Sequence, residues 1–268
     1  MTCADTPLDA TEAGLGAPHA PRDFFDIKGW IQDGDIVLFD WFLRRQRQQG
    51  EPGDLLELGA FLGQSAILMG SYLADGQVFT VCDLFESAAA DPDNAREMRE
   101  CYPTLTRDAF EVNYLSFHDN LPRIVQASSS VLQKVVRADS CRFVHIDASH
   151  LYNQVRRDIH TARDVLGNNG VVVLDDYRSE HTPGVACATW QAVLETGLKP
   201  ICVSGYKFYG TWGDAAAAQE KLAVALERRG DFRLQVEDVA GHKLLMAFAE
   251  EVVRPALPVS RHRAAPQS

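Results

Sequence analysis

Residues 54–65 have the sequence DLLELGAFLGQS, and this stretch decides the fold. Its apolar start predicts a short strand over 54–59, and the residues from Gln64 to Leu73 predict a helix. Gly59 and Gly63 lie in the intervening turn, where a residue without a side chain lets the backbone approach a ligand closely. The helix N-terminus adds free N–H groups and a positive dipole end. The turn suits a carboxylate-bearing ligand, although two glycines can also serve a tight turn alone.

The alternation of strand and helix continues on the C-terminal side of this stretch. Apolar, strand-like runs follow at 77–83, 122–127, 141–147, 170–176, 200–204, 232–238 and 242–249. Apolar residues at helical spacing separate several of them, at 128–137, 151–166, 184–196 and 214–229. Strands that alternate with helices in this way predict an α/β fold built on a mainly parallel sheet.

Composition and charge exclude several classes of protein. The formal net charge of −11 disfavours a general nucleic-acid binder, because phosphate contacts need an excess of Lys and Arg. No apolar stretch predicts a membrane span, and the N-terminus lacks the features of a signal peptide. The six cysteines are scattered without a C-x-x-C pair, which favours a reducing, cytoplasmic compartment.

The domain organisation follows from the same patterns. We expect a flexible tail over 1–22, then an N-terminal helical segment over 23–50 that acts as a lid or an oligomer contact. A single domain follows over 51–252, and a second flexible tail covers 253–268.

An acidic residue ends the second predicted strand. Asp83 follows the glycine turn by about 20 residues, which is the placement of an acid that binds ribose hydroxyls. An isolated Asp more often caps a helix or lies in a solvated loop, so the prediction depends on the turn and Asp83 acting together.

Three further acids end two neighbouring strands of the predicted sheet. Asp147 ends the fourth strand, and Asp175 with Asp176 ends the fifth. Carboxylates that meet at one sheet edge repel one another unless a cation neutralises them, and a hard ion such as Mg²⁺ prefers oxygen ligands. His150, three residues past Asp147, is placed to remove a proton from a hydroxyl. Capping roles for the acids and for His150 are the alternatives, and we expect His145 to be structural.

These motifs together resemble a known family. ELGAFLGQS, VCDLFE, FVHIDASHLYNQVRRDI and GVVVLDDY, in this order, resemble class I S-adenosylmethionine-dependent methyltransferases of the macrocin and mycinamicin sugar O-methyltransferase group. Cephalosporin-hydroxylase-like proteins are relatives of that group. The resemblance implies a Rossmann-like, doubly wound, seven-stranded sheet whose last strand is antiparallel, and it makes residues 51–252 a methyltransferase domain.

The resemblance also implies roles for individual residues. The cofactor S-adenosylmethionine would contact the set Glu57, Gly59, Ala60, Gly63, Ser65, Asp83, Ser128, Ser129 and Asp147. Mg²⁺ would be held by Asp147, Asp175 and Asp176, and His150 would be the base. Other members of the group place an acid where this chain has Ser149, which favours His150 here. The acceptor pocket would be lined by Tyr152, Tyr177, Arg178 and Trp190.

We therefore expect a Mg²⁺-assisted O-methyltransferase that methylates a hydroxyl of a small molecule, such as a sugar or another secondary metabolite. The alternatives are a metal-independent or N-directed methyltransferase, and a cofactor-binding partner protein that has lost catalysis. The absence of G-x-G-x-x-G disfavours a dinucleotide-dependent oxidoreductase. We expect neither nucleic acid nor membrane as a partner, and apolar residues over 23–50 make a homo-oligomer plausible.

Overall fold

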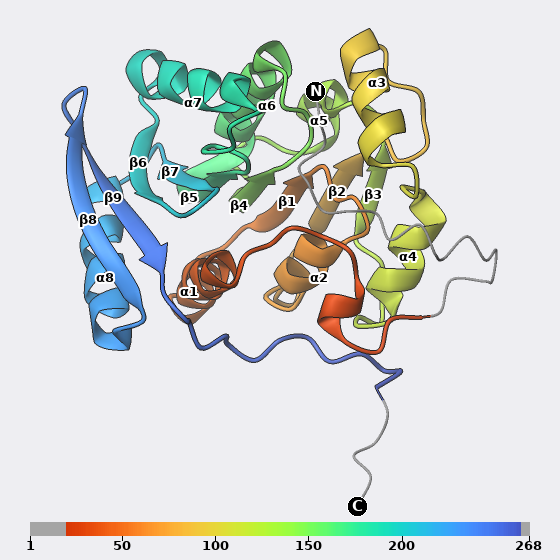
Figure 1. The fold of residues 1–268 in the computed structure, drawn as a ribbon, viewed down its shortest axis with the longest axis horizontal. Helices are drawn as coiled ribbons and strands as arrows, with labels where there is room; N and C mark the ends of the chain where they lie inside the picture. The colour runs from red at the N-terminus through yellow and green to blue at the C-terminus, as the bar shows by residue number, and fades with distance from the viewer. Residues whose placement is uncertain (1–19, 264–268) are drawn as a thin grey trace, which may run out of the picture.

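A nine-stranded sheet forms the centre of residues 20–263, the part of the chain that the computed structural model describes (Figure 1). Its spatial order is β3-β2-β1-β4-β5-β7-β6-β9-β8. The strands are β1 (Asp54–Leu58), β2 (Phe79–Asp83), β3 (Arg123–Gln126), β4 (Cys141–Ile146), β5 (Leu166–Leu174), β6 (Lys199–Val203), β7 (Phe208–Thr211), β8 (Phe232–Val239) and β9 (His242–Ala249). The helices are η1 (Phe24–Asp26), α1 (Asp33–Gln48), α2 (Gln64–Gly70), α3 (Pro92–Cys101), α4 (Arg107–Leu115), η2 (Ser129–Val131), α5 (Leu132–Val135), α6 (Tyr152–Val165), α7 (Pro183–Thr196) and α8 (Ala215–Arg229).

The α/β class and the mainly parallel sheet are confirmed, whereas the number of seven strands is wrong. Strands β1 to β5 pair in parallel, and β7 runs antiparallel between β5 and β6. The hairpin of β8 and β9 then extends the sheet, because β9 pairs in parallel with β6. The sequence pattern does not reveal β7, because its four residues follow β6 after only a tight turn.

Helices cover both faces of the sheet, as expected for strands that are apolar on both sides. Alternate residues of β1 illustrate this arrangement, since Leu55 packs in one hydrophobic cluster while Leu56 and Leu58 pack in the other. Helices α1, α2 and α8 lie on the first face, and α6 and α7 lie on the second (Figure 1). None of the helices described is both long enough and apolar enough to cross a membrane.

The N-terminal helical segment is part of the folded body. Helix α1 buries Ile36, Leu38 and Phe39 in the first cluster. Upstream of it, the Gln64 side chain of α2 donates from Nε2 to the carbonyl oxygen of Ile27 over 3.1 Å. This contact ties the segment to the glycine turn, which agrees with a covering role. Its role as an oligomer contact stays a prediction.

The two predicted tails differ in what can be said of them. Most of the tail over 1–22 lies outside the described residues. The composition of 253–268 predicts a second tail, but residues 253–263 form an extended segment that hydrogen-bonds to the domain. Arg261 N donates to Ser116 O over 2.8 Å, and the buried Ser260 hydroxyl donates to Pro21 O over 2.6 Å. These long-range bonds to backbone carbonyls leave no signature in composition.

Gly59 is required by packing as well as by backbone conformation. Its φ is +78°, and a Cβ built on it would lie 2.1 Å from the carbonyl oxygen of Asp147. Gly76 has a similar φ of +79° with nothing within 4 Å of its Cβ position. Gly59→Ala should therefore cost about 3 kcal/mol or more of unfolding free energy, against about 1 kcal/mol for Gly76→Ala. Urea denaturation of both variants measures the difference, and equal losses would contradict the packing argument.

Candidate active site

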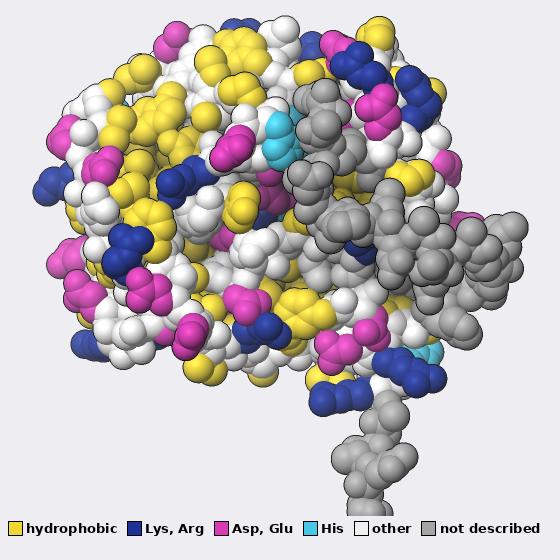
Figure 2. Space-filling model, viewed as in Figure 1, with side chains coloured by type: hydrophobic (Ala, Val, Ile, Leu, Met, Phe, Trp, Pro, Cys, Tyr) yellow, Lys and Arg dark blue, Asp and Glu magenta, His cyan; other side chains and the backbone are white. Residues whose placement is uncertain are grey.

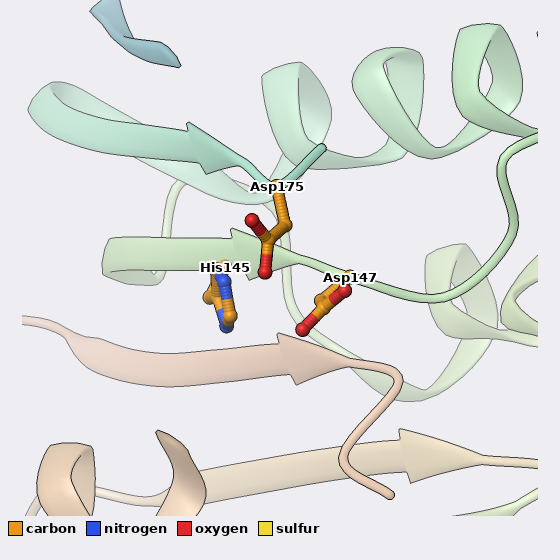
Figure 3. A group of neighbouring side chains, drawn as sticks. All are labelled: His145, Asp147 and Asp175. Carbon is orange, nitrogen blue, oxygen red and sulfur yellow. The ribbon is translucent and has the colours of Figure 1, made fainter. Parts of the chain in front are cut away.

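The carboxyl ends of β4 and β5 bring two of the predicted acids together. Asp147 N donates to Leu58 O over 2.7 Å, and Asp175 N donates to Ile146 O over 3.0 Å, so both residues leave the sheet in register. Their side chains point toward one another, with His145 of β4 beside them (Figure 3). Burial, then the nearby Asp175, raise the pKa of the Asp147 carboxyl well above its ordinary value.

A buried lysine compensates Asp175. Lys207 lies at the end of the turn between β6 and β7, and it is only 2% exposed. Its Nζ forms an ion pair with Asp175 Oδ2 and lies 3.3 Å from His145 Nε2. Burial alone would raise the pKa of Asp175, but the ammonium of Lys207 outweighs it and holds that pKa below its ordinary value. On the other side of His145, its Nδ1 lies 2.8 Å from Glu57 Oε1.

His150 is held between two carboxylates. Its Nδ1 lies 2.5 Å from Glu97 Oε1 of α3, and its Nε2 lies 2.7 Å from Asp176 Oδ2. Asp176 has a φ of +55°, an uncommon conformation for a residue with a side chain, and its N–H donates to Asp175 Oδ1. Burial lowers the pKa of His150, but the bonds to Asp176 and Glu97 dominate and raise it to about 10. In this arrangement both ring nitrogens are occupied.

Two sets of side chains bring three ligand atoms within 4.8 Å of one another among the described residues. We call His145, Asp147 and Asp175 the inner set, and Asp147, His150 and Asp176 the outer set. Asp147 belongs to both sets, whereas Asp175 and Asp176 each belong to one. The predicted trio of Asp147, Asp175 and Asp176 is therefore divided. The outer set offers two carboxylates, which suits a hard cation such as Mg²⁺, while the inner set already holds the ammonium of Lys207.

The glycine turn is braced by the acid predicted to bind ribose. Asp83 Oδ2 accepts from the N–H groups of Ala60 and Phe61 over 2.7 and 3.2 Å, and Oδ1 accepts from Phe85 N over 2.7 Å. Gly63, with a φ of +95°, precedes the first turn of α2. Oδ2 already accepts two bonds, whereas Oδ1 accepts one and can take another, so the brace leaves Asp83 one oxygen with which to contact a ligand. This bracing role is neither of the alternatives, a helix cap or a solvated loop acid, that the sequence left open.

The other residues assigned to the cofactor differ in their burial, from the fully buried Glu57 to the exposed Ser128. Glu57 is completely buried, with Ser65 and His145 as hydrogen-bond partners, and burial raises its pKa to about 8. Ser128 caps η2, and the Ser129 hydroxyl donates to Asp158 Oδ1 of α6 over 2.5 Å. Glu57 therefore supports the site from the protein interior. The Ser129 hydroxyl already has a hydrogen-bond partner in α6.

Three aromatic rings lie over the glycine turn. Trp30 of the N-terminal segment stacks on Phe61 with ring centroids 5.1 Å apart, and Tyr102 lies edge-on to Trp30 at 6.0 Å. Trp30 is half exposed, at 53%. Residues 27–32 therefore lie against the glycine turn that is predicted to bind the cofactor. This position favours a role for the segment as a lid.

A cavity of about 420 Å³ opens between the starts of α3 and α6. It is lined by Asp91 and Asp93 at the start of α3 and by residues 151–154, Arg156 and Arg157 at the start of α6. His150, which pairs with Glu97 of α3, directly precedes the lining residue Leu151, although neither His150 nor Glu97 lines the cavity itself. A smaller space behind the acids, of about 10 Å³, has room for at most one water molecule.

The four residues predicted to line the acceptor pocket make three separate contacts. Tyr152 lines the cavity, and its hydroxyl donates to Gln191 of α7. Trp190 Nε1 donates to the Tyr177 hydroxyl over 2.7 Å, and the Arg178 guanidinium lies 5.5 Å from the Phe248 ring centroid. Hydrophobic side chains gather on this face over α7 and the β6–β7 region (Figure 2). Only Tyr152 lines the larger cavity.

Two residues of the site were missed by the sequence analysis. Lys207 lies in the sequence GYKFYG, where a lysine beside a glycine turn resembles a solvent-exposed hairpin residue. Glu97 lies in the polar helix PDNAREMREC, with nothing to distinguish it from its charged neighbours. Their burial, at 2% and 9% exposed, is visible only in the folded chain.

A family model and several solved structures match the part of the chain that carries this site. Residues 56–177, which contain the glycine turn, Asp83 and the acid cluster, match a family model described as "Methyltransferase domain". The match spans 122 of the 268 residues, somewhat less than half of the chain. The predicted enzyme class, a methyltransferase, is thereby confirmed. No curated protein matches the chain in sequence.

Solved structures agree with the fold of this domain. The O-methyltransferase NovP is 18% identical, with a TM-score of 0.56 over 66% of this chain and 79% of that one. A protein from Corynebacterium glutamicum is 13% identical, with a TM-score of 0.50 over 70% of this chain and 84% of that one. At these identities the similarity establishes the Rossmann-like methyltransferase fold, and the macrocin-like subfamily stays a prediction.

The burial of the Asp158 carboxyl predicts a pH dependence of stability. Burial raises the pKa of Asp158 to about 6, against about 3.9 in an unfolded chain. Because the folded chain keeps this proton to a higher pH, stability should fall by about 2–3 kcal/mol as pH rises from 4 to 6. Asp158→Asn, whose amide oxygen can still accept from Ser129, should remove this part of the slope in urea denaturation. Asp164→Asn, an exposed change on the same helix, should keep it, and a Asp158→Asn slope equal to wild type would contradict the assignment.

Proposed function

We propose that this enzyme transfers the methyl group of S-adenosylmethionine to a hydroxyl of a small-molecule acceptor. The observation that carries the proposal is the meeting of two groups of residues at one sheet edge. Gly59, Gly63 and Asp83 form a braced turn at the ends of β1 and β2, and Asp147 with His150 follows the adjacent strand β4. A cofactor on the turn would therefore present its reactive end toward the histidine and the acids.

The turn has the features that the cofactor requires. The Gly63 position leads directly into the free N–H groups of α2, which suit the carboxylate of the methionine part. Asp83 can accept from the ribose hydroxyls, and Ser128 with Ser129 lies after the neighbouring strand β3, in the position expected for adenine. Trp30 and Phe61 would close over the bound cofactor as a lid.

His150 is the base in this proposal, and Glu97 orients it. A carboxylate on Nδ1 fixes the ring and its tautomer, which leaves Nε2 to take the proton of the acceptor. Nε2 now faces Asp176, and with a pKa of about 10 the ring carries a proton on both nitrogens. The Nε2 proton must therefore leave with the displacement of Asp176 before Nε2 can take the proton of the acceptor hydroxyl. The adjacent cavity carries both acidic and basic side chains, which favours a polar, polyhydroxylated acceptor such as a sugar.

Mg²⁺ assistance belongs to the same proposal, with the outer set as its site. Asp147 and Asp176 would hold the ion, and Asp175 would not, since Lys207 pairs with it. A bound ion would lower the pKa of an acceptor hydroxyl that it coordinates. One observation favours the metal-independent alternative, because Asp175 and Asp176 both have nitrogen partners already. Activity that survives a chelator would establish that alternative.

The cofactor is tested by calorimetric titration with S-adenosylhomocysteine. We expect binding in the wild-type chain and a loss of tenfold or more in Asp83→Asn, which keeps the side-chain volume but removes the charge. Asp91→Asn, at the acceptor cavity, should bind as wild type does. Absence of binding to the folded wild-type chain would refute the proposed cofactor.

The base is tested by His150→Ala and Glu97→Gln. His150→Ala should lower turnover of a hydroxylated acceptor by a factor of about 10² to 10⁴, which is the usual contribution of a general base. Glu97→Gln should lower kcat less, and both variants should bind S-adenosylhomocysteine with unchanged affinity. Turnover that survives in His150→Ala would assign the base to another group.

A further inference from the structure

Lys207 lies among the ligands of the inner set. Its Nζ is paired with Asp175 and is 3.3 Å from His145 Nε2, and both groups belong to that set together with Asp147. A lysine side chain that is 98% buried is rare unless it is paired. The ammonium therefore contacts two of the three ligands of the inner set.

The hairpin fixes this position from the backbone. Ser204 N donates to Lys207 O and Lys207 N donates to Ser204 Oγ, each over 2.9 Å. The tight turn leaves Tyr206 exposed at its tip and directs the next side chain inward.

A third carboxylate supports the ammonium from the N-terminal segment. Asp35 of α1 is 1% exposed, and its Oδ1 accepts from the Tyr209 hydroxyl over 2.7 Å. The Lys207 ammonium is thus paired with Asp175, and the acids Asp147 and Asp35 lie near it.

We propose that Lys207 is the resident cation of the inner set and confines any divalent ion to the outer set. An ion between His145, Asp147 and Asp175 would lie next to the ammonium, and like charges at that distance repel strongly in a buried site. Lys207 is thus a positioning residue, since it holds Asp175 and determines which acids face the acceptor. The inference deepens the proposed function, since it concerns the cation of the same site.

The test counts Mn²⁺ ions bound to the full-length chain, using the electron paramagnetic resonance signal of the free ion. Lys207→Met removes the ammonium and should add one bound ion, or tighten Mn²⁺ binding at least tenfold, relative to wild type. Lys207→Arg keeps the charge and should bind as wild type does. Lys199→Met, an exposed change on β6, is the matched control and should also leave binding unchanged.

A second pair of variants keeps the proposal testable if Lys207→Met does not fold. Where wild type binds Mn²⁺, Asp176→Asn should weaken binding at least tenfold and Asp175→Asn by less than threefold. Equal losses would overturn the proposal, as would a folded Lys207→Met that binds no more tightly than wild type. The experiment needs neither cofactor nor acceptor. If wild type binds no ion but Lys207→Met binds one, the Lys207 inference holds and only the Mg²⁺ part of the proposed function fails.

Discussion

The burial of several carboxylates at the ends of β4 and β5 is the constraint on which the site depends. Asp147, Asp175 and Asp176 leave neighbouring strands within a few ångströms of one another, and charges of one sign so placed are unfavourable without compensation. Lys207 compensates Asp175, and His150 compensates Asp176. Asp147 has no cationic partner of its own among the ion pairs of the described residues, which makes it the acid with most to gain from a bound cation.

The compensating groups come from elements that are distant in sequence, so the fold and the chemistry depend on one another. Lys207 arrives on the β6–β7 hairpin because β7 inserts antiparallel beside β5. Glu97 arrives on α3, and Asp35 arrives on α1 behind the lysine. A substitution in any of these three elements would change the electrostatic environment of the acids, although the acids themselves would be unaltered. The N-terminal segment therefore supports the site electrostatically as well as covering it.

The sequence predicts the parts of the molecule whose signals are local. Strand ends that carry Asp83, Asp147 and Asp175 follow apolar runs directly, and the parallel topology then brings their ends to one edge. Lys207, Glu97 and β7 were not predictable in this way, because each depends on a pairing that no local pattern encodes. The same limit explains residues 253–263, whose order depends on hydrogen bonds to Ser116 and Pro21.

The outer set links the proposed base to the proposed cation. His150 can serve as base only when Nε2 is free of Asp176, and a carboxylate gives up a partly buried, charge-assisted hydrogen bond only if another partner replaces it. Lys207 cannot be that partner, since it is committed to Asp175. The remaining candidates are a cation in the outer set and a polar group of the acceptor itself. In the first case His150 would act as a base only when the metal is bound, and in the second only when the acceptor is bound. The two mechanisms therefore differ in which ligand frees His150 Nε2 from Asp176.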